Sequence, residues 1–191
     1  MFLWNMSFRI SKIPPDVDMQ RRLTTLHIND WLHEDVFHLR WWFLLSLLIF
    51  FVFVWWKMVD KARLSEISLY AALTTIVALG FVEIGEELIL WDFPTDIIPI
   101  FPPLTAVNLA SLPIIYSLIY QYFGTWNSFL WASLGAAAIF CFILEPILVW
   151  GGLYQLLKWK HHYGLPVYLI MAICIRLVLI KIFAITETSG S

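Results

Sequence analysis

Long apolar runs constrain the fold of this 191-residue chain more than any other feature of its sequence. A membrane core about 30 Å thick takes roughly 20 helical residues to cross. Lipid offers no hydrogen-bond partner to an open strand edge, so each run is expected to be a helix. We therefore predict an all-α fold, an integral membrane bundle of five transmembrane helices at about residues 36–58, 65–90, 104–123, 127–150 and 165–185.

The composition supports a membrane protein and excludes one class of partner. Hydrophobic residues make up 61% of the chain and charged residues only 14%, which is unlike a soluble domain. Twelve Lys and Arg against fourteen Asp and Glu give a net charge of −2, without a basic arm or face for a nucleic-acid backbone. The expected partners are the lipid bilayer and either a second copy of the chain or another membrane protein. No complete cofactor motif is present, so no cofactor is expected.

The five runs divide the chain into three regions. Residues 1–35 form a charged, partly amphipathic leader, in which Met19, Leu23 and Leu26 are interspersed with charges. Such a pattern predicts either a helix lying along the lipid headgroups or a solvated, loosely docked segment. Residues 36–185 form the transmembrane domain, and residues 186–191 are expected to be a short disordered tail.

Five spans would place the two termini on opposite sides of the membrane. We name the side that holds the N-terminus and the loops 91–103 and 151–164 face A, and the opposite side face B. Because basic residues favour the cytoplasmic side, a small excess of them on face A predicts a cytoplasmic N-terminus. The basic residues are Arg9, Lys12, Arg21, Arg22, Arg40, Lys158 and Lys160 on face A, and Lys57, Lys61, Arg63 and Lys181 on face B.

Ionisable residues inside the runs are the first candidates for a functional site, because each costs at least about 2.5 to 3.5 kcal/mol to insert. Glu83 shares one helix face with Glu86 and Glu87 by i+3 and i+4 spacing. Arg176 and Glu145 lie in the fifth and fourth runs. We predict that Arg176 and these carboxylates form a cluster in the face A half of the bundle. The alternative is a buried ion pair that only fixes the register of the helices.

Two loops on face A carry further candidates. Loop 91–103 holds four prolines with Asp92 and Asp96, so it cannot be regular helix, and it is too apolar to be freely solvated. We expect a lid folded onto the mouth of the bundle, a shallow re-entrant segment, or an interfacial loop anchored by its aromatic residues. Loop 151–164 holds the adjacent histidines His161 and His162, which are a poor metal pair by themselves. No metal is expected unless carboxylates complete the site.

Two prolines within the runs are expected to bend their helices. Pro113 should kink the third helix, and Pro146, next to Glu145, should kink the fourth. Each kink would free backbone carbonyl groups that could face a cavity.

Several short motifs resemble one known family. The chain is similar to an uncharacterised family of small five-span membrane proteins of spore-forming Gram-positive bacteria over about residues 65–185. The resemblance implies five spans and a location in the bacterial plasma membrane or the spore inner membrane, but it implies no reaction. The motifs are Glu83 with Leu90-Trp91-Asp92-Phe93-Pro94, Leu112-Pro113 with Tyr120-Gln121-Tyr122-Phe123 and Trp126, Glu145-Pro146, and Trp159-Lys160-His161 with Tyr163 and Pro166.

Three functions fit these residues. The first is the binding or permeation of an ion, a proton or a small solute through the intramembrane Glu/Arg cluster. The second is a non-catalytic membrane subunit or scaffold. The third is an intramembrane enzyme acting on a lipid or isoprenoid, with a carboxylate such as Glu83, Glu86 or Asp92 as acid or base and His161 or His162 as its partner. The sequence shows no nucleophile arrangement for an enzyme, so whether the protein is one stays open.

Overall fold

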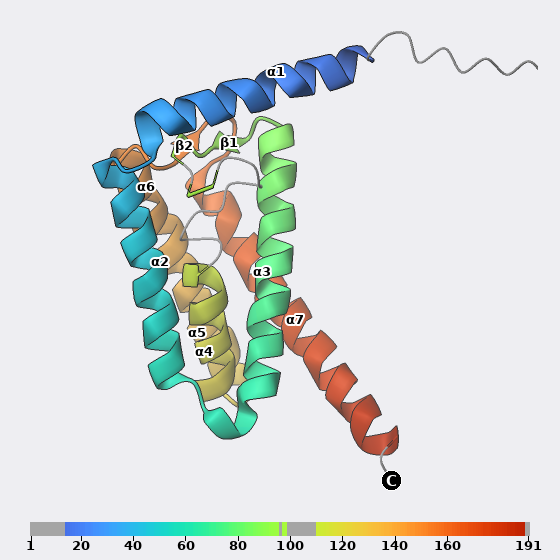
Figure 1. Cartoon of the computed structure of the whole chain (residues 1–191). Coiled ribbons are helices and arrows are strands. Elements are labelled where there is room, and N and C mark those ends of the chain that lie inside the picture. The colour runs from blue at the N-terminus through green and yellow to red at the C-terminus, as the bar shows by residue number, and fades with distance from the viewer. Residues whose placement is uncertain (1–13, 96, 99–109, 190–191) are drawn as a thin grey trace, which may run out of the picture.

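Four helices in the described part of the chain are long and apolar enough to cross a membrane (Figure 1). The computed structural model describes residues 14–95, 97–98 and 110–189, with side chains up to residue 186. The long helices are α2 (Leu39–Met58), α3 (Leu64–Glu87) with the 3-10 turn η2 (Lys61–Arg63) before it, the continuous helix made of α5 (Trp126–Ile139), η4 (Phe140–Leu144) and α6 (Glu145–Trp150), and α7 (His161–Ser189). An all-α bundle is therefore confirmed.

The third expected span is described only in part. Its described part is α4 (Leu112–Tyr122), whose 11 residues rise only about 16 Å, and residues 104–109 lie outside the described residues. Figure 1 shows α4 starting at mid-height in the bundle and running to the end at face B. Pro113 lies in the first turn of α4, directly after the π-helical residues Ala110 and Ser111, so the irregularity predicted at this proline is observed as a change from π-helix to α-helix.

Helix α4 lies at the centre of the bundle, and most of its side chains are buried. Its Tyr116 packs against Phe140 with nearly parallel rings, 6.2 Å between centroids. Trp55 of α2 donates its indole N–H to the Ser117 hydroxyl over 3.1 Å. The core thus forms around a short helix that the longer helices enclose.

Helices α3 and α7 cross in the half of the bundle nearer face B. The buried Tyr70 of α3 donates its hydroxyl to the carbonyl oxygen of Ala172 in α7 over 3.2 Å. Ala172 has no exposed surface, and a residue this small lets the two backbones approach closely. From the crossing toward face A, the two helices diverge (Figure 1).

Helix α2 lies at the edge of the bundle and is apolar on its outer side as well. Only 6% of the residues in its most apolar 18-residue stretch are buried. Phe50, Phe53 and Trp56 are among its large side chains that are more than half exposed. An apolar surface of this extent is unfavourable in water, whereas it suits a hydrocarbon environment.

The two loops of face A pair with each other, which the sequence did not indicate. Strands β1 (Trp91–Asp92) and β2 (Gln155–Leu156) are antiparallel, with Trp91 opposite Leu156. The Leu90 carbonyl oxygen also accepts hydrogen bonds from the backbone N–H groups of residues 157, 158 and 159. The paired strands thus join loops 91–103 and 151–164 into one cover over the face A end of the bundle.

The residues after β1 fold onto the bundle. Thr95 and Ile97 are buried, and Trp41 of α2 donates its indole N–H to the Ile97 carbonyl oxygen over 3.2 Å. This arrangement fits the prediction that the loop covers the bundle mouth. It is observed for residues 91–95 and 97–98; residues 96 and 99–103 lie outside the described residues.

The leader is compatible with the prediction, whereas the tail departs from it. The leader forms α1 (Pro15–Asp30) and a π turn, η1 (Trp31–Asp35), with no buried residue, and α1 lies across the face A end of the bundle (Figure 1). The tail expected to be disordered from residue 186 is instead helical to Ser189, because α7 continues without a break.

Candidate functional site

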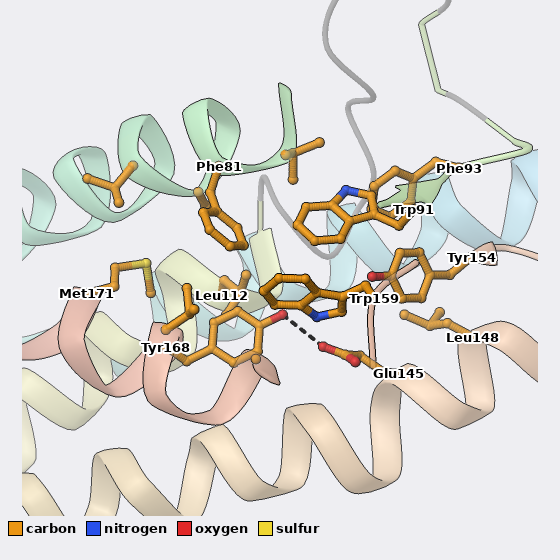
Figure 2. Close-up of a pocket in the computed structure, with 15 residues that line it drawn as sticks. Phe81, Trp91, Phe93, Leu112, Glu145, Leu148, Tyr154, Trp159, Tyr168 and Met171 are labelled. Carbon is orange, nitrogen blue, oxygen red and sulfur yellow. Dashed lines mark hydrogen bonds between the residues drawn. The ribbon is translucent and has the colours of Figure 1, made fainter. Parts of the chain in front are cut away.

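A cavity of about 80 Å³ lies between the diverging parts of α3 and α7 (Figure 2). Helix α3 contributes Val77 and Phe81 to its wall, and α7 contributes Val167 and Tyr168. The β1–β2 cover closes it toward face A with aromatic residues. Because the walls are mostly apolar with few polar groups, the cavity has the character of a ligand pocket.

Aromatic rings that contact one another edge to face form the upper wall. The ring centroids of Trp91 and Trp159 are 5.0 Å apart at an interplanar angle of 84°, and those of Phe81 and Trp159 are 5.9 Å apart at 73°. Trp91 packs directly on Gly85 of α3, where any Cβ would overlap its indole ring. The glycine therefore allows the strand to lie against the helix and so places the tryptophan.

Glu145 is the one acidic side chain among the described residues of the cavity wall, and no Lys or Arg joins it there. It is only 7% exposed. Its Oε1 accepts a hydrogen bond from the Tyr168 hydroxyl over 3.1 Å, which Figure 2 shows, and its Oε2 lies 3.0 Å from Nδ1 of His161. Two neighbours thus hold the carboxylate in one orientation at the polar end of the cavity.

The position of Glu145 follows from its own helix and from α7. It follows the π turn η4 and precedes Pro146, so the predicted irregularity before this proline is observed as a widened turn. On α7, Gly164 approaches the site closely: a Cβ there would lie 2.9 Å from Cys141 Sγ and 3.3 Å from Glu145 Oε1. A glycine at this position leaves room for the carboxylate.

The cavity reaches the outer surface of the bundle. Val77 lines it and yet is 45% exposed. The neighbouring Ile76 is 65% exposed and does not line the cavity. If α3 and α7 span a membrane, the opening between them faces the acyl chains. A molecule dissolved in the bilayer could then enter from the side.

Arg176 is placed elsewhere, which corrects the predicted cluster. It is only 6% exposed, and its guanidinium donates to the carbonyl oxygens of Phe123, over 3.2 Å, and Gly124, at the end of α4 near face B. Within the described residues no ion pair joins it to Glu83 or Glu145. Arg176 leans toward face B, whereas the prediction required it to lean toward face A.

Arg176 is surrounded by aromatic rings instead of carboxylates. Its Cζ lies 4.4 Å from the Phe129 centroid and 4.6 Å from that of Trp126. A helix C-terminus carries partial negative charge on its free carbonyl groups, so it stabilises a cation. The arginine thus joins α7 to the α4–α5 connection.

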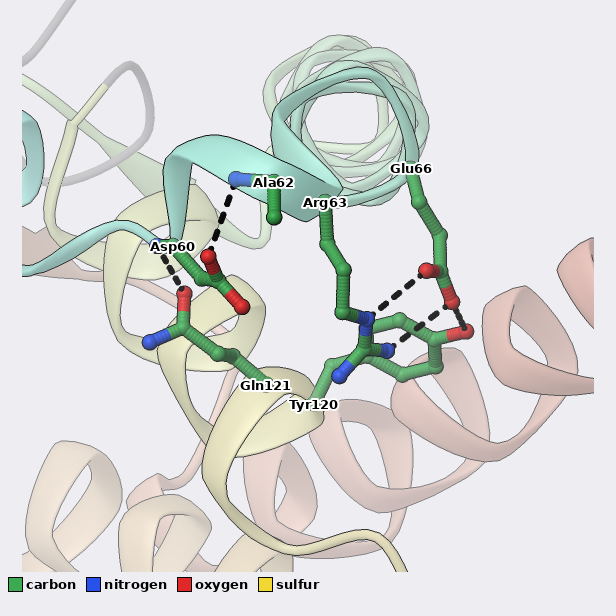
Figure 3. A network of polar contacts seen from close by, with 6 residues as sticks. All are labelled: Asp60, Ala62, Arg63, Glu66, Tyr120 and Gln121. Carbon is green, nitrogen blue, oxygen red and sulfur yellow. Dashed lines mark hydrogen bonds and ion pairs between the residues drawn. The ribbon is translucent and has the colours of Figure 1, made fainter.

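A polar network near the same end holds the α2–α3 connection to α4 (Figure 3). Arg63 pairs with Glu66 through two hydrogen bonds of 3.0 Å, and Tyr120 donates its hydroxyl to the same carboxylate over 2.5 Å. The Gln121 side chain accepts from the Asp60 backbone N–H over 2.9 Å. These residues are satisfied by one another, so the network reads as structural.

The other predicted acids do not line the cavity. Glu83 and Glu87 are exposed on the last turns of α3, and Glu86 is half buried with polar contacts of its own. Asp92 is exposed in β1, and Asp96 lies outside the described residues. The acidic mouth is therefore a set of mostly exposed carboxylates around the face A end.

The two adjacent histidines point in different directions. His161 faces Glu145, whereas His162 is exposed against Tyr163, with ring centroids 4.5 Å apart. In the described ranges, no three His, Cys, Asp or Glu side chains gather in a way that could hold a metal ion.

Sequence reasoning named His161 as a candidate metal ligand or proton-transfer partner, but it missed Gly164 and Tyr168, which complete the site. His161, Gly164 and Tyr168 are spaced i, i+3 and i+7, which places them on one face of a helix. That spacing could have marked the face of α7 that meets Glu145. The pairing of Trp91 with Trp159 left no comparable signal, because it depends on two loops meeting.

Comparisons with known proteins leave the chain without an identified relative. No family model, no curated protein and no solved structure matches it.

Proposed function

We propose that this chain is an integral membrane protein that binds a small apolar or amphipathic molecule from the bilayer in the cavity between α3 and α7. The observation that carries the proposal is a buried carboxylate at the inner end of an aromatic cavity that opens on an apolar outer surface. Such a cavity suits a ligand with an apolar body and one polar group, which Glu145 would receive.

The carboxylate keeps capacity for a ligand. Two carboxylate oxygens offer about four acceptor positions, and Tyr168 and His161 occupy one on each oxygen. A free acceptor position in an apolar cavity selects ligands that carry a hydrogen-bond donor. A ligand polar group buried there without a hydrogen bond would lose its hydration without compensation.

Binding is better supported than permeation. A permeation pathway was expected to run through Arg176 and the glutamates, but Arg176 lies near face B and Glu145 near face A. The Glu145–His161 pair has groups able to transfer a proton, yet no Ser, Thr or Cys nucleophile lies among the described residues of the cavity wall. An enzyme therefore has less support than a binding protein.

The location is proposed on the family resemblance alone. It would place the protein in a bacterial plasma membrane or spore inner membrane. The basic residues of the sequence would then place face A, with the N-terminus, in the cytoplasm.

Photolabelling of the purified protein tests the binding proposal. The probe is a medium-chain alcohol that carries a diazirine on its chain, and labelled peptides are mapped by mass spectrometry. We expect saturable labelling of peptides that contain Phe81 or Val167, reduced by an excess of the unlabelled alcohol.

Two neighbouring substitutions provide a matched pair for this experiment. Val77→Phe adds an aromatic ring at the cavity opening and should abolish the saturable labelling. Ile76→Phe makes a similar change next to the opening and should leave it intact. Saturable labelling that is equal in both variants, or that maps only to α2, would contradict the proposal.

A further inference from the structure

The cavity holds an acidic group, Glu145, that has no permanent counter-charge among the described residues. Glu145 is only 7% exposed, and its one basic partner is His161, which is charged only when protonated. No Lys or Arg lines the cavity among the described residues. A buried carboxylate is stable when a cation pairs with it, so the site favours a ligand that brings a positive charge.

The aromatic wall favours the same kind of ligand. Phe81, Trp91 and Trp159 form a contiguous group around the cavity, with centroid separations of 5.0 to 5.9 Å. Tyr154 and Tyr168 complete the wall near Glu145. A cation close to the face of an aromatic ring is attracted by the electron density of the ring, and an ammonium group surrounded by such rings is a recurring mode of recognition.

The size of the cavity limits how much of the ligand it encloses. A volume of about 80 Å³ holds several water molecules at about 10 to 15 Å³ each. This is enough for a compact head group, but not for a long chain. The chain of an amphiphile would leave between α3 and α7, where Val77 is exposed.

From this geometry we infer that the ligand of the cavity is an amphiphile whose head is an ammonium group, held by Glu145 and the ring of aromatic residues. The inference rests on the proposed function and names its ligand class. An anionic head is disfavoured, because it would meet the Glu145 carboxylate without a Lys or Arg in the described wall. The ammonium could belong to a simple alkylamine or to the head of an aminophospholipid.

Three photoactivatable probes with the same chain test the inference in an uncharged detergent. Their heads are an ammonium, a hydroxyl and a carboxylate, and unlabelled competitors give the apparent affinity of each. We expect the ammonium probe to bind most tightly and the carboxylate probe most weakly. A photoactivatable phosphatidylethanolamine in a parallel arm distinguishes a phospholipid head from a simple amine, because saturable labelling by it at the cavity would identify the phospholipid as a source.

Substitutions separate the charge from the fold. Glu145→Gln should weaken the ammonium probe about ten- to a hundredfold, as expected for a lost charge-assisted contact, and leave the hydroxyl probe nearly unchanged. Glu83→Gln removes an exposed carboxylate of α3 outside the cavity and should change neither. If Glu145→Gln does not fold, Trp159→Leu provides a second test, with an expected loss for the ammonium probe of a few-fold to about thirtyfold.

The outcomes distinguish the two proposals. Equal binding of the ammonium and hydroxyl probes at the cavity, insensitive to Glu145→Gln and Trp159→Leu, would overturn the ammonium head and leave the binding site in place. Saturable labelling of the cavity by none of the probes would overturn the binding function itself. Tighter binding of the carboxylate probe would show that the site recognises an anion, contrary to the inference.

Discussion

Replacing Arg176 by methionine tests how this buried arginine is stabilised. Methionine keeps a long, flexible, apolar side chain in the space of the arginine stem. The substitution removes the two hydrogen bonds to the carbonyl oxygens of Phe123 and Gly124 and the contacts with the surrounding rings. It therefore removes the connection between α7 and the α4–α5 turn with little loss of volume.

The expected magnitude follows from these contacts. Two hydrogen bonds from a charged donor contribute about 1.5 to 3 kcal/mol each, and cation–π contacts at a desolvated site contribute about 2 kcal/mol. The desolvation of the guanidinium offsets several kcal/mol of this sum. We expect Arg176→Met to lower the free energy of unfolding by about 2 to 4 kcal/mol.

The assay is equilibrium unfolding in mixed detergent micelles, followed by tryptophan fluorescence. Lys181→Met, an exposed cation on the same helix, is the matched control and should change stability by less than about 0.5 kcal/mol. Arg176→Lys should lie between the wild type and Arg176→Met, because an ammonium cannot reproduce the planar fork of the guanidinium.

A double-mutant cycle decides between the observed contacts and the predicted cluster. Among the described residues Arg176 and Glu145 share no partner, so the effects of Arg176→Met and Glu145→Gln should add within about 0.5 kcal/mol. A coupling energy above about 1 kcal/mol would show that the two charges interact, and would refute the placement of Arg176 near face B.

Two further predictions concern the cover and the entry to α2. Gly85→Ala should displace Trp91 and destabilise the fold by about 1 to 3 kcal/mol. Gly80→Ala on the same helix adds a Cβ that meets nothing within 4 Å, and it should stabilise the fold by up to about 1 kcal/mol. Thermal unfolding of both variants in detergent tests this difference, and equal effects would contradict it. Partial burial raises the pKa of Asp35 above 3.8, despite a hydrogen bond with the Thr95 side chain. The protonated Asp35 therefore contributes stability below pH 3.8, and this contribution is lost as the pH rises through the raised pKa. Asp35→Asn should be at least as stable as the wild type at pH 7 and should lose that advantage near pH 4. Melting curves across this pH range test the prediction.

The helices were largely predictable because their signal is local. A membrane-length apolar run predicts a helix without knowledge of its neighbours, and four of the five runs form such helices within a few residues of the expected ends. The π turn before Pro146 also follows from a local cause, the missing N–H of the proline. For the run that includes α4, only residues 110–123 are described, and they form the π-helical residues Ala110 and Ser111 followed by α4.

The site was only partly predictable. Glu145 was identified because an acid in an apolar run is expensive wherever the run packs. Its partners Tyr168 and His161 come from α7, and the direction of contact between two helices depends on how they cross. Trp91 and Trp159 meet through a strand pair of two residues each, which is too short to leave a pattern in the sequence.

By itself, the sequence determined which segments become membrane-length helices and which polar groups lie within them, because both depend on hydrophobicity and on helical spacing along one chain. Only the tertiary structure decided which polar groups meet. Glu145 and Arg176 were predicted to attract each other, but the packing of α7 against α3 and α4 places the arginine beside the α4 C-terminus and the glutamate beside an aromatic cavity. Long side chains can reach toward either end of a helix, so the partner is decided by the acceptors that packing brings within reach.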